Sequence, residues 1–159
     1  MIAIRSFLII LCSIGMFCCE RKIYGHIMDI SLPISVVKQI PEIDLLNPNA
    51  KEHYDYNKIL IEYSEYSNQK VNVSTISMNK PVLGLWGNSD KYYLTILAST
   101  YGPLKDKNTI VIYWNDTDKD VLTLFVKQKE NATYIDKVLV NNIVKWSEGN
   151  GQRAITISR

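Results

Sequence analysis

Short stretches in which apolar and polar residues alternate, separated by turn residues, recur along most of this chain. In the first of them, Ile30, Leu32, Ile34 and Val36 alternate with Asp, Ser, Pro and Ser residues. Side chains two residues apart lie on the same face of a strand, so this pattern predicts a strand with one buried face. Pro33, on the opposite face, lacks an amide hydrogen and favours a sheet edge or an irregular pairing.

The later stretches extend the same pattern to the end of the chain. Further strands are expected at residues 42–46, 58–66, 71–78, 81–86, 92–98, 109–114, 121–126, 134–146 and 153–158. A short helix competes only at residues 134–146, where Val138, Val140, Ile143 and Val144 favour a strand. Short strands with a turn every ~8–12 residues predict an all-β fold, an immunoglobulin-like β-sandwich, and argue against alternating strand–helix folds.

The first residues predict export. Arg5 is followed by an almost uninterrupted apolar run from Ser6 to Cys19, which ends at Glu20. This length fits the ~7–15 residues of a signal peptide core and is too short to span a bilayer, which takes ~20 residues. We expect a signal peptide at residues 1–25, cleaved after Gly25 or, alternatively, beside Cys19, which would then carry a lipid.

The mature chain is expected to be a single domain without disulfides. All three cysteines lie before residue 20, so cleavage after Gly25 removes them. Cleavage also removes Arg5, Arg21, Lys22 and Glu20, which lowers the 18 basic and 16 acidic residues to 15 of each. A neutral chain with interspersed charges gives no reason to expect nucleic acid as a partner.

Residue types that carry catalysis are sparse. His26 and His53 lie in polar stretches, and neither has metal-ligand spacing to another His or Cys. The run Asn115-Asp-Thr-Asp-Lys-Asp resembles the start of a calcium loop, but it lacks the glycine and the distal Glu of such a loop, so we interpret it as a solvated turn. No enzyme, cofactor site or metal site is predicted.

Several segments, taken in order, resemble the alpha-type (class 5) fimbrial subunits, the pilins of colonisation factors in enteric pathogens. The resembling segments are the strand from Ile30, Ile40-Pro-Glu-Ile-Asp-Leu-Leu, Ile59-Leu-Ile-Glu-Tyr-Ser-Glu, residues 90–98, residues 109–114 and residues 148–157. The resemblance covers most of the chain after the signal, and the segment at Ile40 is its most specific part.

The resemblance implies a sandwich that lacks one strand and is completed by the N-terminal strand of the next subunit. Residues 26–40 would be the donor extension and residues 41–159 the sandwich, with Ile30, Leu32, Ile34 and Val36 filling the neighbour's groove. The expected partners are copies of the chain or related subunits, a periplasmic chaperone and an outer-membrane usher. The expected location is a fimbria on the cell surface that attaches bacteria to host surfaces. The alternative is a periplasmic or outer-membrane protein that acts as a binding or immunity protein.

Overall fold

The computed structural model describes residues 25–63, 70–73, 82–85, 91–100 and 106–159, with the backbone alone for 82–85. In this part of the chain, most residues form strands, and a 3-10 turn lies at Tyr56–Lys58. The all-β prediction is therefore confirmed. The predicted signal peptide lies outside the described residues except for Gly25. Parts of three expected strands lie outside them as well: residues 64–66 of 58–66, residues 74–78 of 71–78, and residues 81 and 86 of 81–86.

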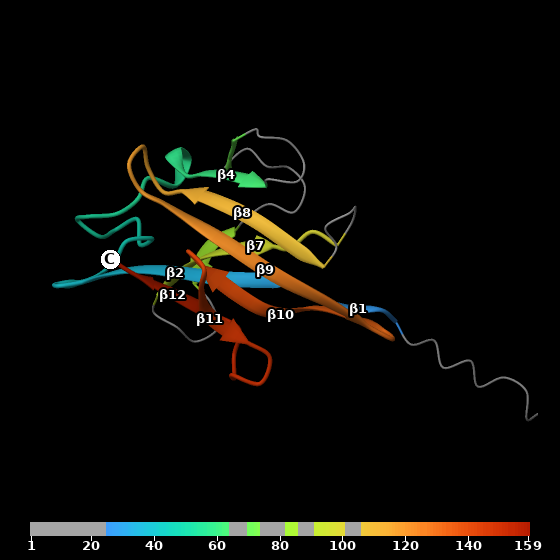
Figure 1. Ribbon diagram of the computed structural model, residues 1–159. Coiled ribbons are helices and arrows are strands. Elements are labelled where there is room, and N and C mark those ends of the chain that lie inside the picture. Colours follow the sequence, from blue (N-terminus) through green and yellow to red (C-terminus); the bar gives the residue numbers. More distant parts are fainter. Residues whose placement is uncertain (1–24, 64–69, 74–81, 86–90, 101–105) are drawn as a thin grey trace, which may run out of the picture.

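The strands form two sheets that pack face to face as a β-sandwich (Figure 1). The larger sheet has the order β1 (Ile27–Asp29), β10 (Ala132–Val140), β9 (Lys119–Lys129), β8 (Lys107–Tyr113), β4 (Leu60–Tyr63) and β5 (Val71–Asn72), with β11 (Ile143–Ser147) also paired to β10. The smaller sheet has the order β12 (Ile155–Ser158), β2 (Ser31–Gln39), β7 (Tyr92–Leu97) and β6 (Val82–Leu85), with β3 (Glu42–Asp44) also paired to β2.

The core lies between the two sheets and follows from the alternation in the sequence. On β8 and β9 every second residue is buried, and Ile110, Ile112, Leu122 and Leu124 are fully buried. Each buried aliphatic side chain contributes about 1.5–3 kcal/mol relative to an exposed one. The fully buried Trp114, just after β8, extends the core toward one end of the sandwich.

The stretch expected to be one strand at residues 134–146 is a hairpin of two strands. β10 and β11 pair antiparallel, and Asn141 and Asn142 connect them with φ angles of 49° and 67°. Two consecutive positive φ angles match the turn that suits the right-handed twist of a hairpin, and Asn adopts this backbone conformation at little cost. Strand was correctly predicted over helix, but the Asn-Asn turn signal was missed.

The N-terminal segment contributes to both sheets. β1 pairs parallel with β10 in the larger sheet, and after Ile30 the chain enters the smaller sheet as β2. In this single chain, residues 26–40 are therefore not an extension outside the sandwich. The boundary expected between residues 40 and 41 falls in the turn that joins β2 to β3.

Pro33 was expected to favour a sheet edge or an irregular pairing, and it lies on an interior strand of the smaller sheet whose pairing is incomplete at this residue. It pairs with Thr95 of β7 on one side of β2, whereas the pairing with β12 on the other side begins only at Ile34. The carbonyl of Ser31 accepts a hydrogen bond from Arg153 on the β12 side, and residues two apart point the same way. The nitrogen of Pro33 thus faces the β12 side at a point where no strand requires a donor.

Candidate functional site

The four residues predicted to act as donor-strand residues lie on one face of the N-terminal strand and point into the core of their own chain. Leu32, Ile34 and Val36 are fully buried, and Ile30 is partly buried and packs against the same core. The predicted alternation is thus present on the inward face. The outward face differs from the expectation, because Pro33, Ser35 and Val37 are buried as well.

β2 occupies a groove in the smaller sheet and is paired along both of its edges. On one edge, Ser31 to Ile34 pair antiparallel with β7, and on the other, Ile34 to Val37 pair parallel with β12. The pairing continues past β12, where the amide of Arg159 donates to the carbonyl of Val37 at 2.9 Å and the amide of Gln39 donates to the carbonyl of Arg159 at 3.2 Å. Without β2, facing edges of β7 and β12 would lose their partner and the core would be exposed.

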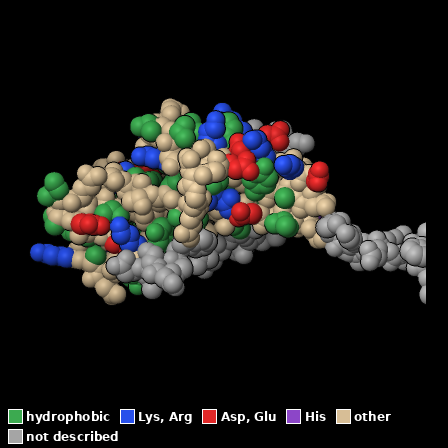
Figure 2. Space-filling view, turned by 90° about the horizontal axis from the view of Figure 1, so that it is seen from below, with side chains coloured by type: hydrophobic (Ala, Val, Ile, Leu, Met, Phe, Trp, Pro, Cys, Tyr) green, Lys and Arg blue, Asp and Glu red, His purple; other side chains and the backbone are tan. Residues whose placement is uncertain are grey.

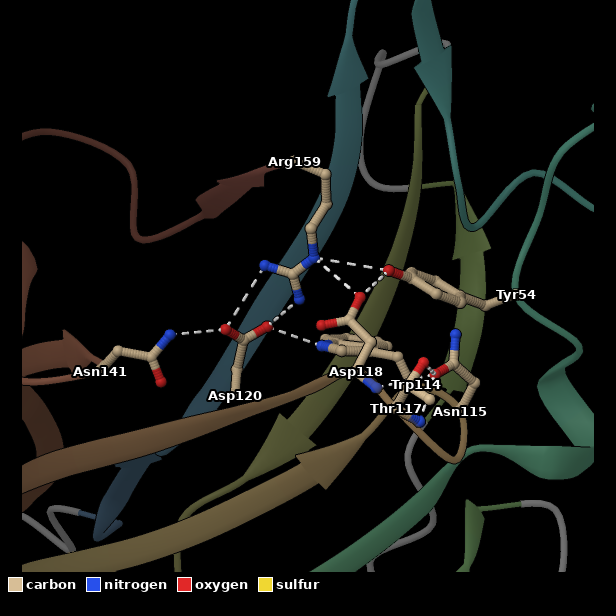
Figure 3. Close-up of polar contacts among 8 residues, drawn as sticks. All are labelled: Tyr54, Trp114, Asn115, Thr117, Asp118, Asp120, Asn141 and Arg159. Atoms are coloured by element: carbon tan, nitrogen blue, oxygen red, sulfur yellow. Dashed lines mark hydrogen bonds and ion pairs between the residues drawn. The ribbon is translucent and has the colours of Figure 1, made fainter.

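A polar cluster at the end of the groove ties β12 to the larger sheet (Figure 3). Its centre is the carboxylate of Asp120, which is 1% exposed. Asp120 accepts hydrogen bonds from Trp114 Nε1 at 2.7 Å and from Asn141 Nδ2 at 2.7 Å, and it pairs with the Arg159 guanidinium. Burial alone would raise the pKa of Asp120, but these three donors outweigh it and lower the pKa below its usual value.

A second carboxylate extends the cluster toward the loop before the 3-10 turn. Asp118 pairs with Arg159 Nε at 3.0 Å and accepts a hydrogen bond from the hydroxyl of Tyr54. The ring of Tyr54 stacks on Trp114, with 5.6 Å between ring centroids. Burial and the hydrogen bond to Asp118 raise the pKa of Tyr54 to about 12, so the hydroxyl stays a donor at neutral pH.

The run that resembled a calcium loop contributes to this cluster instead of forming a loop of metal ligands. Asn115 Oδ1 accepts from the amides of Thr117 at 2.9 Å and Asp118 at 2.8 Å, which is the geometry of a side-chain-capped turn. The predicted turn is therefore present, but the expectation that the whole run is solvated was wrong for Asp120. Across the described ranges, no group of three or more His, Cys, Asp or Glu residues is arranged to hold a metal ion.

Both histidines are exposed, as expected. His26 Nε2 lies 2.7 Å from Thr133 Oγ1, and His53 Nδ1 lies 2.8 Å from the carbonyl of Ala50.

On the face shown in Figure 2, basic and acidic side chains are interspersed among apolar ones.

The sequence analysis missed Asp120 and Arg159 as a pair. The two residues are 39 positions apart, and only the packing of β12 against the larger sheet brings them together. The one signal in the sequence was the position of Asp120 in the alternation of the strand, because it falls on the same face as the apolar Leu122 and Leu124. A charged residue at a core position usually requires a partner.

Among the residues that the structure describes, no helix has the length and apolar character needed to cross a lipid bilayer. Comparison with protein-family models, with curated proteins and with solved structures finds no match for this chain.

Proposed function

We propose that this chain is a structural subunit of a surface fimbria that polymerises by exchange of the N-terminal strand. The observation that carries the proposal is the fit between β2 and its groove. Six consecutive residues, 32–37, are buried there, and both edges of the strand are paired. A strand of the same sequence from another copy offers the same side chains and the same backbone groups, so the groove can accept it with the same contacts.

Exchange of this strand favours an open polymer and explains the need for helper proteins. The donor strand and the acceptor groove are different surfaces of the subunit. A polymer therefore always has a free groove at one end and a free strand at the other, and the contact does not close on itself. A groove without its strand exposes apolar core residues and two unpaired sheet edges, which favours aggregation. A periplasmic chaperone that covers the groove and an outer-membrane usher that exchanges subunits are the partners this proposal requires. The resulting fimbria would attach bacteria to host surfaces.

The test replaces inward-facing residues of the strand by charged ones. The full-length protein is expressed for export in a bacterial host, and its oligomers are measured by size-exclusion chromatography with light scattering. The double variant Leu32→Asp, Ile34→Asp is expected to lose the oligomers, because two carboxylates cannot enter the apolar core unpaired. Ile40→Asp is the matched control, because Ile40 lies in the same segment but is 88% exposed.

A second measurement separates loss of exchange from loss of folding. The double variant is refolded with a synthetic peptide of residues 26–39, which supplies an intact strand in trans. Recovery of a folded complex is expected. The proposal is wrong if the wild-type protein stays monomeric at high concentration and the groove of the variant does not take up the peptide.

The alternative is an exported binding protein that acts as a monomer, and one observation favours it. β2 lies in the groove of its own chain, so a single copy already has a paired sheet and a covered core. This alternative predicts a monomer that is stable without any partner and does not exchange its strand with the peptide.

A further inference from the structure

The groove needs a feature beyond apolar alternation to hold its strand in one register. A shift of one residue would turn the apolar face of β2 outward, but a shift of two residues, about 6.6 Å, preserves the faces. Leu32, Ile34 and Val36 are all aliphatic, so they discriminate poorly between two registers of the strand that differ by two residues. Polar contacts at fixed positions of the strand can make that distinction.

Arg153, just before β12, makes the first of these contacts. Its Nε donates to the carbonyl of Ser31 at 2.9 Å, and its Nη2 forms an ion pair with Asp29. The Arg153 side chain is 11% exposed and lies over the ring of Trp146, 5.6 Å from the ring centroid. The sandwich thus holds this guanidinium in place, while its two acceptors belong to the N-terminal segment, Asp29 to β1 and Ser31 to β2.

These contacts lie in a pocket of about 390 Å³ where the chain crosses from β1 to β2. The strand contributes Asp29, Ser31 and Pro33 to its wall, and the sandwich contributes Tyr134, Trp146 and Arg153, among others. The indole Nε1 of Trp146 donates to the carbonyl of Gly151 at 3.3 Å, so the ring under Arg153 is itself fixed. A strand shifted by two residues would displace its carboxylate by about 6.6 Å from its present position beside Arg153.

Ser35 makes the second contact, within the segment of β2 that pairs with β12. It is fully buried, and its Oγ lies 2.9 Å from Thr156 Oγ1 and donates to the carbonyl of Ile155 at 3.4 Å. A shift of two residues would place Pro33 or Val37 at this position. Neither has a hydroxyl, so the hydrogen bond to the Ile155 carbonyl would be lost.

We propose that Arg153 and Thr156 select the incoming strand by its carboxylate at position 29 and its hydroxyl at position 35. This inference rests on the strand exchange proposed above. The preferred partner is a copy of this chain, or a related subunit whose N-terminal strand carries an acidic residue six positions before a Ser or Thr. Strands that match only in apolar alternation would be rejected.

The test measures capture of fluorescein-labelled peptides of residues 26–39 by the full-length protein, refolded from denaturant with excess peptide. Fluorescence anisotropy gives the apparent affinity. Asp29→Asn is expected to weaken capture about fivefold and Asp29→Lys about tenfold or more, because an ion pair and a charge-assisted hydrogen bond are lost or reversed. Met28→Lys is the control for Asp29→Asn. It changes the peptide charge by the same amount at a half-exposed neighbour and should not weaken capture.

The reciprocal change is made on the protein. The Asp29→Lys peptide is expected to regain at least half of its lost affinity on an Arg153→Glu chain, and the wild-type peptide to lose affinity there. Ser35→Val in the peptide should weaken capture about fivefold. The peptide variants leave the protein unchanged, so the result does not depend on whether Arg153→Glu folds.

The outcomes separate this inference from the proposed function. Equal capture of the wild-type, Asp29→Lys and Ser35→Val peptides would overturn the selection by Arg153 and Thr156 and leave strand exchange intact. Failure to capture even the wild-type peptide would overturn strand exchange and, with it, the selection.

Discussion

Removing the Arg159 side chain should destabilise the sandwich and release β12 from the larger sheet. Arg159→Met keeps most of the aliphatic length and leaves the backbone bonds to Val37 and Gln39 in place. The buried carboxylate of Asp120 then loses its only cationic partner among the contacts the structure describes. The effect of the substitution is thus confined to the polar cluster at the end of the groove.

The size of this loss of stability depends on the contacts that Asp120 keeps in the variant. Breaking a buried ion pair by removing one partner costs about 3–5 kcal/mol. Asp120 keeps its hydrogen bonds from Trp114 and Asn141, and the Arg159 side chain is 24% exposed, so water reaches part of the cluster. We therefore expect Arg159→Met to lower the free energy of unfolding by about 2–3 kcal/mol at pH 7.

The loss of unfolding free energy in Arg159→Met should be larger at pH 7 than at acidic pH. The pKa of Asp120 is lowered in the folded protein, so its contribution is present above the unfolded pKa of about 4 and is lost as the pH falls through the folded pKa. Once Asp120 is protonated, Arg159 no longer stabilises the charge of that buried carboxylate. The difference between wild type and variant should therefore shrink on going from pH 7 to pH 2.5.

Urea denaturation followed by tryptophan fluorescence measures both effects, since Trp114 lies within the cluster. Lys38→Met serves as the control, because Lys38 pairs with Glu52 at 2.7 Å and the two side chains are 36% and 54% exposed, far more than Asp120. Its effect should stay below about 1 kcal/mol. A loss under 0.5 kcal/mol for Arg159→Met at pH 7, or a loss of the same size at pH 2.5, would refute the reasoning.

Two further substitutions test the same region. Trp114→Phe keeps an aromatic ring beside Tyr54 but removes the Nε1 donor to Asp120, so urea denaturation should show a loss of about 1–3 kcal/mol. Asn142→Gly should raise the melting temperature by a degree or two, because Gly adopts the positive φ of the hairpin turn without steric cost. Asn141→Gly should instead lower it, because the Asn141 side chain binds both Asp120 Oδ1 and the amide of Val121.

Much of the fold could be predicted from local pattern. Alternation identified β7, β8, β9 and β12 close to their observed bounds, because residues two apart share a face whatever the topology. The turn at Asn115 was also recognised, since a side chain that caps its own turn is a local feature. The hairpin at Asn141 and Asn142 was missed because valines on both sides favour a strand and conceal a two-residue turn.

The site was only partly predictable. Ile30, Leu32, Ile34 and Val36 stood out because their alternation is local, and they do lie on one inward face. The burial of Ser35 and the contacts of Arg153 with Asp29 and Ser31 could not be foreseen. They join residues more than 100 positions apart, and no local pattern reports such a pairing.

The sequence alone determined that this chain forms strands and that its first strand has an apolar face suited to a β-sandwich core. Only the tertiary structure decided where that strand lies, which edges pair with it and which charges meet at its ends. The physical reason is that strand formation follows from the spacing of neighbouring residues. The partner of a strand, and the partner of a buried charge such as Asp120, is chosen by packing between distant parts of the chain.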